Sequence, residues 1–174
     1  MNSSAQDDVA ALFLAHSDKK LEEMTGYLEA CVRQLSDEQV WRRGGAHENA
    51  VGNLVLHLCG NMRQWILHGV DKQPDVRTRD AEFETGVNGG GMSASELMEL
   101  FRGTVAECRT AMEKVSAERL VERTNPQPPR SGEVSVLDAI YQVVGHVQQH
   151  VGQIILLTKQ MVGTDLDLTL PRKR

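Results

Sequence analysis

Three of the six histidines in the chain have the spacing of a metal site. His146 and His150 are four residues apart within a long helical stretch, and His57 lies inside an earlier one. Residues four apart project from the same side of an α-helix, so these two imidazoles can hold one metal ion. A third histidine from a facing helix would complete three nitrogen ligands and leave one position open for water or substrate, as in catalytic zinc sites.

A histidine at the edge of an apolar helix face is more often a hydrogen-bonded structural residue than a ligand. The pair on one helix is more informative because Val143, Val147 and Val151 lie beside it. Polar rings set into an apolar seam need a partner that offsets their desolvation. A metal ion is one such partner, and buried water or carboxylates are the others.

Other residues near the trio are weaker candidates. Glu48 and Asn61 are candidates for groups that assist the site or transfer a proton. Three glycines close to the trio in sequence indicate either room for a ligand or tight helix packing: Gly60, Gly145 and Gly152. The remaining histidines have the positions of surface or cap residues and are not expected to bind metal: His16, His47 and His68.

Local sequence also bears on the reaction and on the redox compartment. Val147 stands where the helical zinc-protease motif has its general-base glutamate, so peptidase activity by that mechanism is not expected. The cysteines are far apart and form no Cys-x-x-Cys pair, which predicts reduced, buried thiols: Cys31, Cys59 and Cys108.

Length and charge limit the function classes. The 174 residues suit one domain spanning 1–174. With 24 acidic and 19 basic residues, the net charge of -5 disfavours nucleic-acid binding, and the basic ending Arg172–Arg174 is expected to be solvated tail. The N-terminal segment lacks the pattern of a signal peptide or a membrane span, so we expect a soluble, cytoplasmic protein.

Helices are expected to position the histidines, because four long segments have helical periodicity and no strand pattern persists. The sequence therefore predicts an all-α fold. The expected starts are near or before Ser17, at an Asn49 N-cap, and at the caps Ser93 and Ser135, while Gly163 marks the final end. The expected helices are 17–35, 49–70, 93–120 and 135–162.

The connection between the second and third helices is long. It runs from Asp71 to Met92, about 22 residues, which exceeds what two antiparallel neighbours need. We therefore expect a crossover across one end of the bundle, with the second and third helices running parallel.

Several phrases resemble the DinB/YfiT-like superfamily of metalloenzymes. They are 49–61 (NAVGNLVLHLCGN), 137–141 (LDAIY) leading to His146, and 150–154 (HVGQI). The stretch 79–83 (RDAEF) is similar to one typical of an uncharacterised branch of that superfamily. The resemblance covers most of the chain, from the first long helix to the end of the fourth.

The resemblance implies a four-helix bundle with a long crossover between helices two and three, and frequently a homodimer. It also implies a divalent metal, commonly zinc or nickel, held by the residues that match its ligand positions: His57, His146 and His150. Relatives are said to use low-molecular-weight thiols as S-transferases or in a thiol-dependent isomerase, and others hydrolyse. The exposed apolar residues Phe83 and Val87 are candidates for a dimer interface.

The leading functional hypothesis is a metal-dependent enzyme acting on a small molecule, in which an open coordination position binds and deprotonates a thiol or water. The alternative is a non-enzymatic metal-binding or dimeric scaffold bundle. A third, a structural bundle without metal, would keep the three rings apart or hydrogen-bonded to each other.

Overall fold

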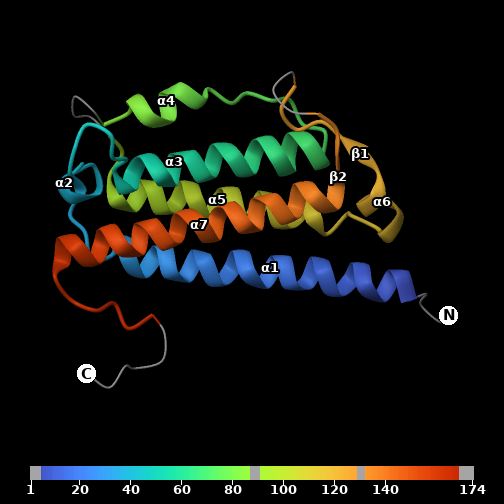
Figure 1. The fold of residues 1–174 in the computed structure, drawn as a ribbon, viewed down its shortest axis with the longest axis horizontal. Coiled ribbons are helices and arrows are strands. Elements are labelled where there is room, and N and C mark those ends of the chain that lie inside the picture. The colour runs from blue at the N-terminus through green and yellow to red at the C-terminus, as the bar shows by residue number, and fades with distance from the viewer. Residues whose placement is uncertain (1–4, 87–90, 129–131, 169–174) are drawn as a thin grey trace.

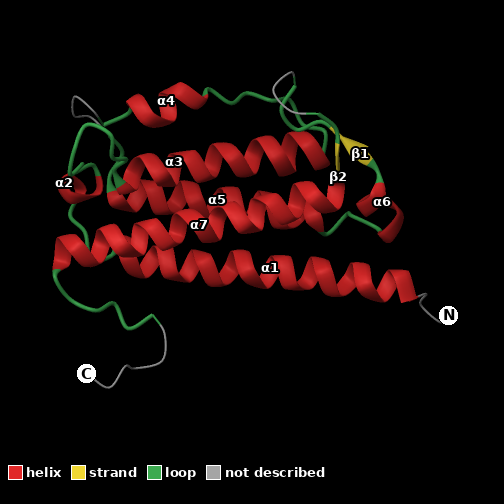
Figure 2. Cartoon of the chain, viewed as in Figure 1, coloured by secondary structure: helices red, strands yellow, loops and turns green. Residues whose placement is uncertain are grey.

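Four long helices form a bundle in the computed structural model, which describes residues 5–86, 91–128 and 132–168 (Figure 1). The long helices are α1 (Ala5–Val32), α3 (Val51–Met62) with its continuation η1 (Arg63–Val70), α5 (Ala94–Met112) and α7 (Val136–Val162). The short elements are α2 (Asp37–Val40), α4 (Arg79–Glu84), α6 (Ala117–Val121) and the antiparallel strands β1 (Arg123–Thr124) and β2 (Val134–Ser135). Figure 2 shows how little of the described chain is strand, and the all-α prediction is confirmed.

The helices pack so that α3 contacts both α5 and α7, while α1 contacts the same two helices. Figure 1 shows α3 and α5 running in one direction and α1 and α7 in the other, as the long crossover predicts. The expected path of that crossover was wrong. It runs along the outer side of α3, with α4 packed on that helix, and does not simply cross one end of the bundle.

Polar caps set the starts of the helices. The capping box expected at Ser93 is present, and the expected cap Ser135 forms a capping box with Asp138 as well. The N-cap of α3 is Ala50 and not Asn49. The alanine side chain accepts no hydrogen bond from the first turn, but Asn53 inside the helix accepts the Ala50 N–H at 3.2 Å, as the third helical residue of a capping box does. The third long helix also ends earlier than expected, at Met112, because Ser116 caps the separate helix α6.

The second long helix changes its winding partway along. From Arg63 it continues as the π-helical segment η1, and the Asp71 N–H donates to the Ile66 carbonyl, five residues back, at 2.9 Å. Such wider turns are rare and frequently accompany functional sites. The change begins less than two turns after His57.

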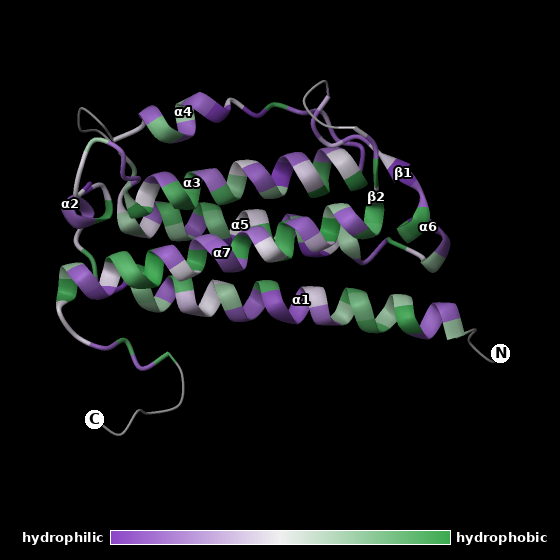
Figure 3. Cartoon of the chain, viewed as in Figure 1, coloured by the Kyte–Doolittle hydropathy of each residue, from purple (hydrophilic) through white to green (hydrophobic). Residues whose placement is uncertain are grey.

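Apolar residues recur along the long helices, as the green bands in Figure 3 show, and most of them are buried in one core. The largest that are fully buried include Phe101, Leu21, Leu28, Leu58, Met62, Ile66, Leu97, Ile140 and Ile154. The three cysteines are free and buried, as predicted. Leu166 and Leu168 of the tail also pack against the core. Among the described residues, no helix is both long and apolar enough to span a membrane. Val87 and Arg172–Arg174 lie outside the described residues.

Candidate metal centre

The structure brings together the three histidines that the sequence singles out. His57 comes from α3, and His146 and His150 come from successive turns of α7, the helix that packs on α3. One ring nitrogen from each histidine lies within 4.8 Å of the others, and the Nε2 atoms of His57 and His146 are 3.0 Å apart. Three nitrogens bound tetrahedrally at about 2.0–2.1 Å would be about 3.3 Å apart, so small ring movements suffice to bind one ion.

A proton or a cation must lie between the two ring nitrogens through which His57 and His146 face each other. Their Nε2 atoms face each other at 3.0 Å, and two neutral imidazoles with both lone pairs directed at one another would repel. Either one nitrogen carries a proton and donates it to the other, or a cation lies between them. The hydrogen bond is the arrangement expected of a structural bundle without metal, whereas a bound metal ion would also engage the nearby His150.

The outer nitrogen of His57 faces a buried carboxylate from the crossover. Its Nδ1 lies 2.9 Å from Oε2 of Glu82, in helix α4. Arg77 binds the same carboxylate with Nε at 2.7 Å and Nη2 at 2.9 Å, and Nη2 also lies 3.1 Å from the His57 Nδ1. A histidine that binds metal through Nε2 commonly donates its Nδ1–H to a carboxylate in this way.

His150 has a comparable, neutral partner. Its Nδ1 lies 2.7 Å from Oε1 of Gln153, one turn further along α7, and donates its proton there when Nε2 is the ligand. The Nδ1 atoms of His57 and His150 thus both have a side-chain partner, and only that of His57 faces charged groups.

Burial keeps the α7 histidines neutral. Desolvation is the main reason that the pKa of His146 falls to about 4, and the nearby His150, His57 and Arg77 lower it further. Desolvation also lowers the pKa of His150, against the opposing effect of its hydrogen bond to Gln153. Burial favours a raised pKa for Glu82, but the hydrogen bonds from Arg77 and His57 outweigh it, so this pKa lies below its usual value. Neutral imidazoles and a charged carboxylate are the forms that a metal site needs.

The depressed pKa of His146 predicts a pH dependence for the metal-free protein. Between about 6.5 and about 4, the unfolded chain binds a proton at this residue that the folded protein binds less well. The free energy of unfolding should therefore fall as the pH drops through this window. Urea denaturation at pH 7 and pH 5 measures the change, and a His146→Asn variant should show a smaller one. An equal slope in both proteins would contradict the assignment.

The two candidate assisting groups lie in different surroundings. Glu48 is exposed and accepts the Gly44 N–H at 2.9 Å, so it serves the loop before α3. Asn61 lies one turn after His57 and is 6% exposed, and its Oδ1 has no hydrogen-bond partner among the described residues. A buried acceptor without a partner is unusual in proteins, and a bound molecule or water would satisfy it.

The three glycines near the trio differ in their surroundings. A Cβ at Gly60 would lie 2.9 Å from Cδ of Glu82, so this position must stay small for the carboxylate to reach His57. A Cβ at Gly145 or Gly152 would meet nothing within 4 Å. Close packing therefore explains neither Gly145 nor Gly152, whereas Gly60 makes room for the Glu82 side chain of α4, which packs on α3.

Several residues at the site were not identified individually from the sequence. The sequence singles out Glu82 and Gln153 only as members of the stretches RDAEF and HVGQI, and it gives no signal for Arg77. Asn53 is fully buried and donates to the carbonyls of Glu82 and Thr85, both at 2.9 Å, which fixes α4 on α3. Phe83, expected to be exposed, is half-buried with its ring 5.0 Å from that of His57. A crossover has no periodicity that would align these residues with the histidines.

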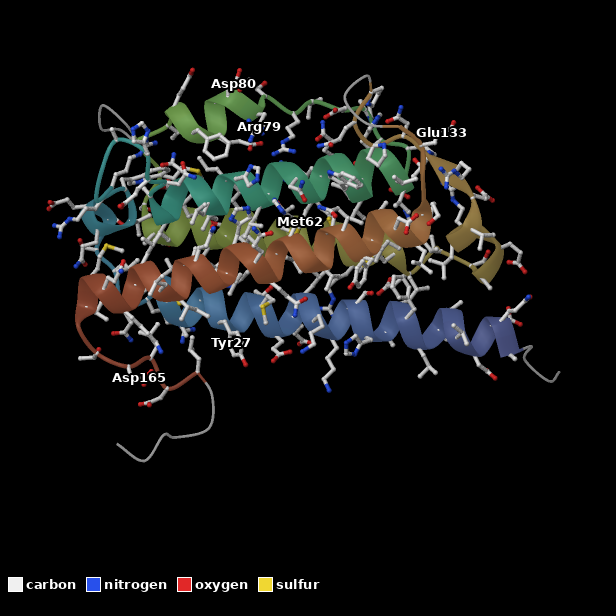
Figure 4. All side chains as sticks on the ribbon, viewed as in Figure 1. Tyr27, Met62, Arg79, Asp80, Glu133 and Asp165 are labelled. Carbon is white, nitrogen blue, oxygen red and sulfur yellow. The ribbon has the colours of Figure 1, made fainter. Side chains whose placement is uncertain are left out.

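Arg79 lies outside this cluster, at the start of α4, where Figure 4 shows it beside Asp80 on the crossover above α3. Its guanidinium carbon is 5.1 Å from the centre of the Phe83 ring. The stacking holds a positive charge on the outer side of the aromatic ring that contacts His57.

Comparison with known proteins agrees with this architecture. The family model described as "Protein of unknown function (DUF1572)" matches residues 8–174. The fold is similar to the crystal structure of the DinB-like protein YjoA from Bacillus subtilis, with 11% identity and a TM-score of 0.64 over 86% of this chain and 94% of that one. A DinB-like protein from Bacillus cereus gives 16% identity and a TM-score of 0.62, covering 88% of this chain and 92% of the other. No curated protein matches the chain significantly.

Proposed function

The chain belongs to the DUF1572 family of DinB-like proteins, and we propose that it is a metal-dependent enzyme that binds a divalent ion through His57, His146 and His150. The observation that carries this proposal is the convergence of three imidazoles from α3 and α7, with one nitrogen of each within 4.8 Å of the others. The low pKa of His146 supports it, because an imidazole must be neutral to bind metal at neutral pH.

The donor set fits an ion such as zinc or nickel, since imidazole nitrogen suits both. A divalent ion held by three neutral ligands supplies Lewis acidity, which lowers the pKa of a thiol or water at its open position towards neutrality. Glu82 holds the outer proton of His57, and Gln153 holds that of His150. The Phe83 ring packs against that of His57, with the two ring centres 5.0 Å apart. The reaction class we propose is transfer to a low-molecular-weight thiol, or hydrolysis, of a small-molecule substrate.

A second candidate is a non-enzymatic metal-binding bundle. It is favoured by the state of the carboxylate at the site, because Glu82 is bound by both Arg77 and His57 and is not free to act as a general base. Such a protein would retain the ion but show no turnover with a panel of thiols and esters. Turnover that disappears on chelation would exclude it.

The test of metal binding is elemental analysis of protein purified without an immobilised-metal column. We expect close to one zinc or nickel ion per chain, lost on dialysis against a chelator and regained on adding the metal. Removal should lower the melting temperature, because an ion that binds only the folded state stabilises it. Protein without metal, whose melting temperature does not change with added zinc or nickel, would refute the proposal.

We also propose a homodimer in the cytoplasm. The reduced state of the three buried cysteines suits a reducing compartment. Exposed apolar side chains gather where the N-terminal part of α1 meets α6 and the start of α7: Val9, Val121 and Leu137. A second copy of the chain would cover this surface, and light scattering that reports a monomer would exclude it.

A further inference from the structure

We propose that Glu82 is a positioning residue for the metal ligand His57, that Arg77 holds Glu82 in this role, and that metal binding and docking of the crossover therefore reinforce each other. The inference rests on the proposed function. It concerns residues of the crossover, which lie outside the two helices that carry the histidines. The crossover then connects α3 to α5 and also supplies two residues of the metal centre.

Burial is the first argument for this role. Arg77 and Glu82 come from a surface connection, yet their side chains are only 5% and 9% exposed. A buried ion pair gains little stability over apolar side chains of the same size, because both charges lose their hydration. Apolar side chains would be enough to dock the crossover on α3. The free-energy cost of burying this ion pair is therefore explained by the carboxylate that it places beside His57.

The geometry of the clamp is the second argument. Arg77 binds both oxygens of the Glu82 carboxylate, which fixes its plane and its rotamer. Arg77 Nη1 in turn donates to Oε1 of Gln64 at 3.0 Å, and Gln64 donates to Asp75 at 2.8 Å. Hydrogen bonds therefore connect the carboxylate that faces His57, through Arg77, to Gln64 of η1 and fix its position.

The tautomer of His57 is the third argument. A guanidinium can only donate, so Arg77 favours the His57 tautomer with a bare Nδ1, which keeps the proton on Nε2. A carboxylate can only accept, so Glu82 favours the opposite tautomer, with the proton on Nδ1 and a free Nε2. Only the second can bind metal through Nε2. The Glu82 oxygen is the nearer of the two to Nδ1, at 2.9 Å against 3.1 Å for Arg77 Nη2, and Arg77 already donates to both oxygens of that carboxylate, so Glu82 determines the tautomer in this proposal.

Coupling to the crossover follows from these contacts. Docking of segment 75–85 brings Glu82 to His57, and a metal ion on Nε2 keeps the Nδ1 proton that Glu82 accepts. By thermodynamic reciprocity, the factor by which docking strengthens metal binding equals the factor by which metal strengthens docking. Loss of an outer partner of a metal-bound histidine typically weakens binding by about 10–100-fold, so this is the expected size of both effects.

The test compares the full-length wild type with Glu82→Gln and with Glu84→Gln, which removes the same charge from an exposed position on α4. Zinc affinity is measured by competition with a chelator. We expect the dissociation constant to rise about 10–100-fold in Glu82→Gln and to stay within about 2-fold in Glu84→Gln. Zinc should slow amide hydrogen exchange in segment 75–85 of the wild type by up to the same factor, but much less in Glu82→Gln.

A spectroscopic readout separates positioning from simple structural support. In ¹⁵N spectra of the metal-free proteins, the His57 ring should carry its proton mainly on Nδ1 in the wild type and shift towards Nε2 in Glu82→Gln. If Glu82→Gln does not fold, Arg77→Lys keeps the charge but loses the two-point clamp, and we expect a smaller loss of zinc affinity, up to about 10-fold.

The outcomes distinguish this inference from the function on which it rests. Equal zinc affinity and an equal His57 tautomer in wild type and Glu82→Gln would overturn the inference and leave metal binding intact. Wild-type protein that binds no zinc or nickel would refute the proposed function, whatever the tautomer. Arg77→Lys with unchanged affinity would remove Arg77 from the assignment.

Discussion

Replacing His146 by alanine is expected to weaken zinc or nickel binding by more than about 100-fold. Loss of a group that only supports a ligand costs about 10–100-fold, and loss of the ligand itself must cost more. The nitrogen of His146 lies 3.0 Å from that of His57, so its removal leaves two nitrogens and opens the side of the site towards α7. Metal content by elemental analysis and affinity by chelator competition measure the effect.

The same variant tests whether the ion stabilises the fold through this site. At a free metal concentration 1,000 times the dissociation constant, one bound ion adds about 4 kcal/mol to the free energy of unfolding. The wild type should show this increase in urea denaturation, and His146→Ala should lose most of it. His16→Ala is the matched control, because His16 is exposed on α1 and far from the trio in sequence. Equal metal-dependent stabilisation in all three proteins would place the ion elsewhere.

The fold and the trio could be predicted because both depend on short-range periodicity. His146 and His150 are one helical turn apart, so any α-helix there brings them to one side. Pairing with His57 needed only that α3 and α7 be neighbours, which their long apolar faces favour. Helix ends were less predictable. At the start of α3 the hydrogen bond comes from Asn53, inside the helix, and it forms only because the backbone of Ala50, just before the helix, lies within reach.

The rest of the site could not be predicted because the crossover has no such periodicity. Glu82 lies 25 residues from His57 in the chain, and only the path of 71–86 along α3 brings them together. The length of this connection was predicted correctly, but its expected path across one end of the bundle was wrong. Desolvation of buried histidines calls for a metal, water or a carboxylate as partner, and the structure has both a carboxylate beside His57 and two further imidazoles around it.

Replacing Gly60 by alanine is expected to destabilise the protein by about 1–3 kcal/mol, the usual range for overpacking a filled interior. Alanine is otherwise the better helix former by about 0.5–1 kcal/mol, so the sign of the change is the informative result. The added carbon would lie 2.9 Å from Cδ of Glu82 and 3.0 Å from Nε of Arg77. The carboxylate must then leave His57, and zinc affinity should fall together with stability.

Gly103→Ala is the matched control for this substitution. Gly103 lies inside α5 with nothing within 4 Å of an added carbon, so alanine there should stabilise the protein by about 0.5–1 kcal/mol and leave zinc affinity unchanged. A double-mutant cycle with Glu82→Ala isolates the clash. If Gly60→Ala acts by displacing Glu82, it should cost much less in a protein that already lacks the carboxylate. Equal cost in both backgrounds would show that the glycine serves α3 itself and not the carboxylate beside His57.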